Sequence, residues 1–63
     1  MSWIDINEER PIWYNNVDLK VNGEIRENWH RLSADGETVY YGTNHSDEVI
    51  FEDEVTHWRN HEL

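Results

Sequence analysis

The residues with the clearest potential for chemistry are two histidines near the C-terminus. His57 and His61 lie four positions apart, and Glu54 precedes His57 by three positions. On a helix these side chains would share one face, and imidazole and carboxylate groups are common zinc ligands. A strand over 55–58 would break that arrangement, and the sequence offers no evident fourth ligand. We therefore expect a solvated polar tail here, with no metal and no cofactor.

Carboxylates are numerous, but their number does not by itself indicate catalysis. The chain has 63 residues and no cysteine, so it has neither a thiol nucleophile nor a thiolate zinc site. Acid–base catalysis needs a pocket that separates two pKa values, and a chain of this length encloses little volume. We find no glycine-rich phosphate loop and no Ser-His-Asp pattern. The expectation is a protein that is not an enzyme.

The charge balance narrows the choice of partner. Asp and Glu outnumber Lys and Arg by 14 to 5, which gives a formal net charge of −9. Nucleic acids and anionic membranes are bound by basic residues, so we expect neither as a direct partner and favour a basic protein surface. The acids concentrate around the apolar segment 49–51, at Asp47, Glu48, Glu52, Asp53 and Glu54.

This acidic group has two interpretations. Charged residues at the ends of an edge strand protect it from aggregation and keep the protein in solution. Alternatively, carboxylates on alternate strand positions form a regularly spaced negative surface that imitates a phosphate backbone and occupies a basic groove. The sequence leaves both interpretations open.

Aromatic residues argue that the chain folds. They make up 13% of the sequence, whereas disordered segments contain few of them. We assign Trp3, Trp29 and Trp58 to an aromatic-rich core in a single small domain over 1–63. Trp13 and Tyr14 precede the apolar pattern, and adjacent strand residues point to opposite faces, so we interpret them as an exposed contact for a partner.

The alternation of apolar residues predicts strands. Strict period-two alternation over 17–21 is followed by Asn22-Gly23, a strong hairpin signal. The returning segment 24–32 has helical as well as strand spacing, and pairing decides in favour of a strand. A two-residue loop would put the two apolar sets on opposite faces. A three-residue loop with a bulge at the glycine opposes Leu19 to Ile25 and gives one apolar face, so we favour it.

The same reasoning predicts a second hairpin at 34–36, which would pair Arg31 with Val39 and Trp29 with Tyr41. The apolar run 49–51 predicts a further strand, and 3–6 predicts an edge strand. The segment 7–11 predicts a turn or a single helical turn that ends at Pro11. The expected fold is mainly β: a small antiparallel meander of four to five strands with an aromatic-rich core and one short helical turn.

Four features along the chain resemble a known family. They are Trp3-Ile4, Pro11 after an acidic stretch, Asn22-Gly23, and Val55-Thr56-His57-Trp58. Together they resemble the small phage and prophage proteins grouped as domain of unknown function 551. The resemblance implies a small β-rich fold and a phage origin, and it assigns no catalytic residue. With no charged-then-apolar leader and no membrane-length apolar run in the sequence, we expect the protein in the host cell cytoplasm.

These observations lead to one leading hypothesis and one alternative. We expect a phage-encoded acidic interaction protein that binds and inhibits or redirects a host protein, such as a defence or nucleic-acid-processing protein. A mixed aromatic and acidic surface is favoured over pure DNA mimicry. The alternative is a structural or regulatory homo-oligomer without a host target, with the aromatic surface as its homodimer interface. The expected partner-binding residues are Trp13, Tyr14, Asp47, Glu48, Glu52, Asp53 and Glu54.

Overall fold

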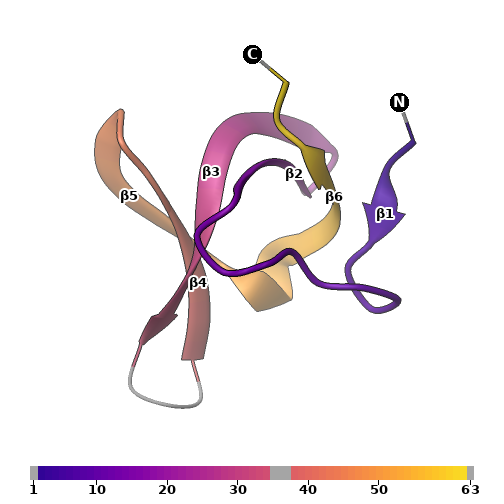
Figure 1. Ribbon diagram of the computed structural model, residues 1–63, viewed down its shortest axis with the longest axis horizontal. Coiled ribbons are helices and arrows are strands. Elements are labelled where there is room, and N and C mark those ends of the chain that lie inside the picture. The colour runs from indigo at the N-terminus through magenta and orange to yellow at the C-terminus, as the bar shows by residue number, and fades with distance from the viewer. Residues whose placement is uncertain (1, 35–37, 63) are drawn as a thin grey trace.

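The computed structural model describes residues 2–34 and 38–62, which form a six-stranded antiparallel sheet with one 3-10 turn (Figure 1). The strand order is β1-β6-β2-β3-β4-β5, so β6 returns to lie between β1 and β2 and the sheet is more than a meander. The elements are β1 (Ile4–Asp5), β2 (Asn16–Val21), β3 (Glu24–Ala34), β4 (Thr38–Thr43), β5 (Ser46–Phe51), η1 (Glu52–Glu54) and β6 (Val55–Asn60).

The connection between β5 and β6 requires the sheet to curl. These strands are four places apart in the strand order, yet only the three-residue turn η1 joins them. In a flat sheet they would lie about 19 Å apart, at roughly 4.8 Å per strand. A 3-10 turn rises only about 2 Å per residue. The sheet therefore bends back on itself, and Figure 1 shows β3 curving around the molecule.

The β2–β3 hairpin has a two-residue turn, which corrects the three-residue loop predicted from the sequence. Asn22 and Gly23 have φ values of 53° and 81°, both in the left-handed region that such turns require. Leu19 consequently lies opposite Arg26 and not opposite Ile25. The prediction that Ile25 faces the core is wrong, since half of this residue is exposed.

Because of a bulge inside β3, the apolar residues of β2 and β3 share the core face farther from the turn. The register shifts between Val17 and Leu19, so that β3 contains one extra residue and Trp29 lies opposite Val17. Asn28 occupies the bulge with a φ of 65°, and its N–H donates to Asp18 Oδ1 at 3.1 Å. Asn tolerates this left-handed conformation better than most residues. The bulge that we expected at the turn therefore lies within β3.

The β3–β4 pairing also differs from the prediction, by two residues. Arg31 lies opposite Tyr41, whereas the sequence predicted that it would lie opposite Val39. The predicted turn at 34–36 falls partly on residues 35–37, which lie outside the described chain. Because a shift of two residues keeps each side chain on its own face, Trp29 and Tyr41 still point into the core, and both are buried.

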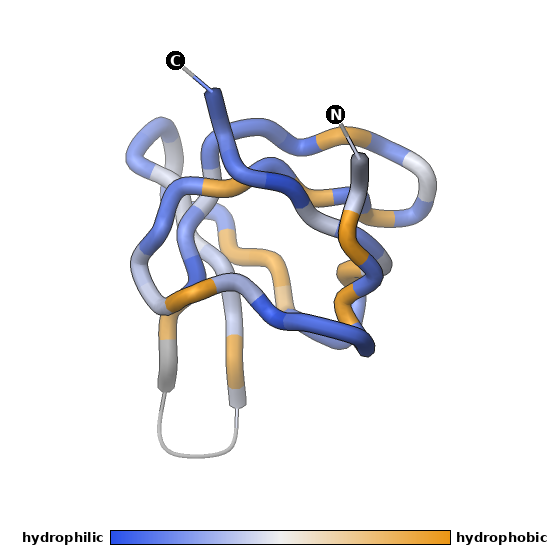
Figure 2. The backbone as a smooth tube through the Cα atoms, turned by 45° about the vertical axis from the view of Figure 1, so that its right-hand side comes forward, coloured by the Kyte–Doolittle hydropathy of each residue, from blue (hydrophilic) through white to orange (hydrophobic). Residues whose placement is uncertain are grey.

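The core lies on the concave side of the curled sheet and is a mixture of aliphatic and aromatic side chains. Trp58 is part of it and donates its indole N–H to the Glu9 carbonyl at 2.8 Å, which fixes the N-terminal segment against β6. Trp3 is partly exposed, contrary to its assignment to the core. Among the described residues the buried hydrophobic ones are Ile6, Val17, Leu19, Trp29, Tyr41, Ile50, Val55 and Trp58. Figure 2 shows that hydrophobic positions, coloured orange, are distributed over several segments of the chain.

The remaining predicted elements have clear counterparts. The strands expected at 3–6 and 49–51 correspond to β1 and β5, and η1 follows directly on β5. The C-terminal segment is the strand β6, so the helical arrangement of His57 and His61 does not form. No helix within 2–34 and 38–62 has the length and apolar composition needed to cross a membrane.

Candidate functional surface

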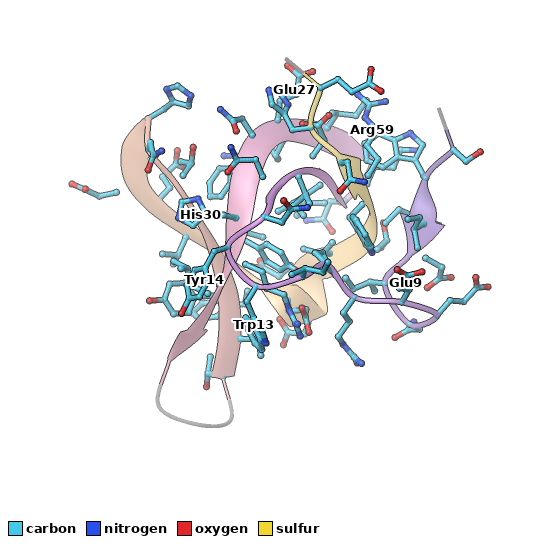
Figure 3. The ribbon with its side chains drawn as sticks, viewed as in Figure 1. Glu9, Trp13, Tyr14, Glu27, His30 and Arg59 are labelled. Carbon is cyan, nitrogen blue, oxygen red and sulfur yellow. The ribbon has the colours of Figure 1, made fainter. Side chains whose placement is uncertain are left out.

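Three consecutive large hydrophobic residues are exposed on the loop between β1 and β2. The exposed fractions are 75% for Ile12, 41% for Trp13 and 68% for Tyr14. The preceding Pro11 is fully buried and anchors the loop to the body of the protein. The structure therefore places Trp13 and Tyr14 at the surface, where a partner can reach them (Figure 3).

Hydrogen bonds hold this loop in one conformation. The Tyr14 N–H donates to the Arg31 carbonyl at 3.0 Å, and the Asn15 N–H donates to the Ile12 carbonyl at 3.2 Å. The Asn15 side-chain amide donates to Asn60 Oδ1 at 3.2 Å. Tyr14 has a φ of 67°, which is uncommon for a bulky residue and persists only where the surroundings stabilise it. The exposed side chains are thus presented by an ordered loop.

Arg31 connects this loop to the acidic turn η1. Its guanidinium lies 3.9 Å from the centroid of the Trp13 ring, a cation–π contact. Its Nη1 donates to the Pro11 carbonyl at 3.2 Å, and its Nε donates to Glu52 Oε2 at 2.7 Å. One face of the Trp13 ring is therefore covered within the protein, and the rest of the side chain remains accessible.

Glu52 was predicted as a partner-binding residue, and the structure gives its carboxylate internal partners. It accepts hydrogen bonds from Arg31, from Arg10 Nε at 3.1 Å and from the Tyr41 hydroxyl at 2.7 Å, and its side chain is only 15% exposed. Burial by itself would raise the pKa of Glu52, but the bonds from Arg31 and Tyr41 outweigh burial and hold the pKa below its ordinary value. Burial, together with this carboxylate, raises the pKa of Tyr41.

The other four predicted acids are exposed, and they form two separate pairs. Asp47 and Glu48 lie near the start of β5, whereas Asp53 and Glu54 lie in η1 beyond its end. Glu48 lies 3.6 Å from Arg26, and Glu54 accepts the Phe51 N–H at 3.1 Å. At about 3.3 Å per strand residue, the length of β5 separates the two pairs. The structure therefore does not bring the predicted acids together into one cluster.

Contacts within the protein engage all five basic residues. Arg10 and Arg31 pair with Glu52, Arg26 with Glu48 and Arg59 with Asp18, while Lys20 Nζ lies 4.8 Å from the centroid of the Trp3 ring. Of the twelve described acids, nine make no ion pair with another described residue. They are Asp5, Glu8, Glu9, Glu24, Glu27, Asp47, Asp53, Glu54 and Glu62. The accessible charge is accordingly negative.

Asp18 is a buried carboxylate that was not among the residues predicted from the sequence. It accepts hydrogen bonds from Arg59 Nε at 2.9 Å, from His61 Nδ1 at 2.7 Å and from the Asn28 N–H. These bonds outweigh the effect of burial and lower the pKa of Asp18 below its ordinary value. The signal in the sequence was the position of Asp18 between the apolar residues Val17 and Leu19. A residue between two core-facing strand residues points to the opposite face of the sheet.

The contact with Asp18 also changes the interpretation of the C-terminal histidines. The His61 side chain is only 18% exposed and packs against β2, so the expectation of a solvated tail is wrong at this residue. His57 lies on β6 opposite Asp5 and Lys20. The described part of the chain contains no group of three or more His, Asp or Glu side chains arranged to hold a metal ion.

No family model matches the chain, and neither a curated protein nor a solved structure is significantly similar to it.

Proposed function

We propose that this protein is an acidic interaction domain that binds a basic surface of another protein and thereby inhibits or redirects it. The observation that carries the proposal is the ordered loop with three exposed hydrophobic residues, Ile12, Trp13 and Tyr14. Exposed apolar groups on a small domain mark interaction sites, and Trp and Tyr supply much of the binding energy in protein interfaces. The resemblance to phage proteins makes a host cytoplasmic protein the proposed target.

The charge distribution supports a basic partner. Because the basic residues are engaged within the protein, its field is dominated by unpaired acids. Such a field accelerates the encounter with a basic surface, while the aromatic contacts slow dissociation. The separation of Asp47 and Glu48 from Asp53 and Glu54 favours a mixed aromatic and acidic contact over imitation of a DNA backbone, because no continuous row of carboxylates connects the two pairs.

The proposal is tested by affinity capture with a matched set of variants. The immobilised protein is incubated with host lysate at 50 and 500 mM NaCl, together with the double variant Ile12→Ser/Tyr14→Asn. Asn at position 14 tolerates the left-handed backbone. The control is Ile25→Ser, which removes an equally apolar residue that is 50% exposed on β3. We expect the wild type and the control to retain one specific protein and the double variant to lose it. Absence of a specific protein at both salt concentrations contradicts the proposal.

The same purified chain distinguishes the homo-oligomer from the interaction domain. Two copies with a net charge of −9 each repel one another, whereas a basic partner attracts either copy. We expect sedimentation equilibrium at micromolar concentration to give the mass of a monomer. A stable dimer that dissociates in the Ile12→Ser/Tyr14→Asn variant would instead support the homo-oligomer.

A further inference from the structure

The face of the sheet opposite the core carries its own row of apolar residues. Leu32 on β3 lies opposite Tyr40 on β4, and Tyr40 lies opposite Phe51 on β5. Directly paired residues project to the same face, so these three side chains form a row across three strands. Their sequence neighbours Tyr41 and Ile50 are buried in the core, which places the row on the outer face.

A second row runs beside the first and contains a glycine. His30 lies opposite Gly42, and Gly42 lies opposite Val49. A Cβ added to Gly42 would meet Leu32 Cδ1 at 3.1 Å and His30 Nε2 at 3.8 Å, so these two side chains reach over the glycine. Val49 remains 49% exposed and Phe51 46% exposed. The β5 side of this face is therefore open to a partner.

The exposed loop adjoins this face. The hydrogen bond from the Tyr14 N–H to the Arg31 carbonyl places Tyr14 beside β3, between the positions of His30 and Leu32. Figure 3 shows Tyr14 and His30 on the same side of the β3 and β4 ribbons. We call the combined surface the outer stripe, and it consists of Tyr14, Leu32, Tyr40, Val49 and Phe51.

Acidic residues flank the outer stripe along β5. Asp47 lies two positions before Val49, and Asp53 and Glu54 closely follow Phe51; all three are exposed, whereas the Glu48 carboxylate lies 3.6 Å from Arg26, which is paired with the core residue Leu19. A second copy of this chain would bring the same acids against one another. A segment that carries apolar residues between lysines or arginines would instead place its apolar side chains on the stripe and its positive charges beside the acids at both ends.

The edge of β5 is partly closed to the addition of another strand. The Glu48 N–H donates to Ser46 Oγ at 3.2 Å, and the Phe51 N–H donates to Glu54 Oε2 at 3.1 Å. Side chains that occupy edge donors in this way disfavour pairing with another backbone. The side-chain face, and not the strand edge, is therefore the available contact surface.

We propose that the outer stripe binds a polypeptide segment of another protein in which apolar side chains are flanked by lysine or arginine. This inference rests on the proposed function and adds to it the binding surface and the chemistry of the partner.

A peptide titration tests the inference on the full chain. The probe is a nonapeptide of three lysines, three leucines and three lysines, titrated into the ¹⁵N-labelled protein and followed by NMR. We expect saturable shifts at the amides of Leu32, Tyr40, Val49 and Phe51. Two control peptides, with serines in place of the leucines or glutamates in place of the lysines, should bind at least tenfold more weakly. Shifts confined to other residues, or equal binding of the serine peptide, would overturn the inference.

Substitutions within the outer stripe test whether the lysine–leucine peptide binds there. Val49→Ser and Phe51→Ser should each weaken binding of the lysine–leucine peptide by about tenfold, whereas Ile25→Ser, with similar exposure elsewhere on the surface, should leave it unchanged. Circular dichroism confirms that each variant is folded. Equal weakening in all three variants would contradict the inference.

The same variants separate failure of the stripe from failure of the proposed function. If the wild type captures a protein from lysate, and Val49→Ser and Phe51→Ser capture it equally well, the interaction function stands and the outer stripe is wrong. If the peptide binds at the stripe but no protein is captured, the surface stands and the proposed function is wrong.

Discussion

Asp18 and Glu52 act as polar cross-links in a chain that has no cysteine. Each carboxylate accepts hydrogen bonds from three residues that are distant in sequence, through which Asp18 joins β2 to β3 and β6, and Glu52 joins η1 to β3 and β4. A buried carboxylate is stable only when such donors compensate for the loss of water. These two residues therefore serve the fold, whereas most other acids remain available at the surface.

The pKa of Glu52 predicts sensitivity to acid. Burial raises this pKa, but the bonds from Arg31 and Tyr41 lower it further, so the net value lies below the ordinary 4.5. A carboxyl with a lowered pKa in the folded state stabilises the protein above pH 4.5, and this contribution is lost as the pH falls through the folded-state value. We expect Glu52→Gln to lower the free energy of unfolding at pH 7 by about 1–3 kcal/mol and to reduce its loss in acid.

Urea denaturation between pH 3 and pH 7, followed by tryptophan fluorescence, measures both effects. Glu8→Gln is the control, because Glu8 is exposed and makes no ion pair with a described residue, and it should change stability by less than about 0.5 kcal/mol. Equal acid sensitivity of the wild type and Glu52→Gln would show that Glu52 does not carry this contribution.

The hydrogen bonds of Asp18 predict that its substitution destabilises the fold. Asp18→Asn removes the negative charge that pairs with Arg59 and His61 and replaces one of the two acceptor oxygens by an NH₂ donor, so one of these partners loses its acceptor in a largely buried site. We expect a loss of about 3 kcal/mol in the free energy of unfolding at pH 7. Asp53→Asn, at an exposed acid, is the matched control and should have little effect. A similar small change in both variants would count against the cross-link.

At the scale of elements, the bulge in β3 determines which residues face the core. The alternation over 17–21 and the turn at Asn22-Gly23 correctly predicted the first hairpin, but not its loop length. Local sequence could not show the bulge at Asn28, because the bulge depends on the bond to Asp18 across the sheet and on the burial of Trp29 behind it. Periodicity identifies strands, whereas long-range packing selects their register.

Substitutions at Asn28 test the importance of this bulge. Its φ of 65° suits Gly, so Asn28→Gly should retain the fold with a cost of about 1 kcal/mol or less. Asn28→Val places a β-branched residue in the left-handed region and should cost at least about 2 kcal/mol more than the Gly variant. Chemical denaturation of the two variants side by side measures the difference. Equal stability would mean that the bulge is not needed in its present conformation.

At the scale of the whole molecule, the excess of acids opposes compact folding. Nine described acids lack an ion pair, while the basic residues are all engaged. Curling of the sheet brings this charge onto one small body, in which like charges repel over distances comparable to the Debye length of about 10 Å at 0.1 M salt. The protein is therefore expected to be stabilised by screening.

The dependence of the melting temperature on salt concentration tests this repulsion. We expect the melting temperature to rise between 20 and 300 mM NaCl, because repulsion among many unpaired acids is screened more than the few partly buried ion pairs are weakened. The double variant Glu8→Gln/Glu9→Gln, which removes two exposed negative charges, should show a smaller rise. A melting temperature that falls with salt would show that ion pairs dominate the balance.

The sequence by itself determined the all-β class, the strands at 17–21 and 49–51, the exposure of Trp13 and Tyr14 and the acidic character of the surface. These follow from alternation, turn chemistry and composition, which are local or additive properties. Only the tertiary structure decided that Glu52 is internal, that a bulge at Asn28 sets the register of β3, and that the outer stripe exists. Contacts between residues that lie 8 to 42 positions apart decide these features, and no local pattern encodes the register that brings such residues together.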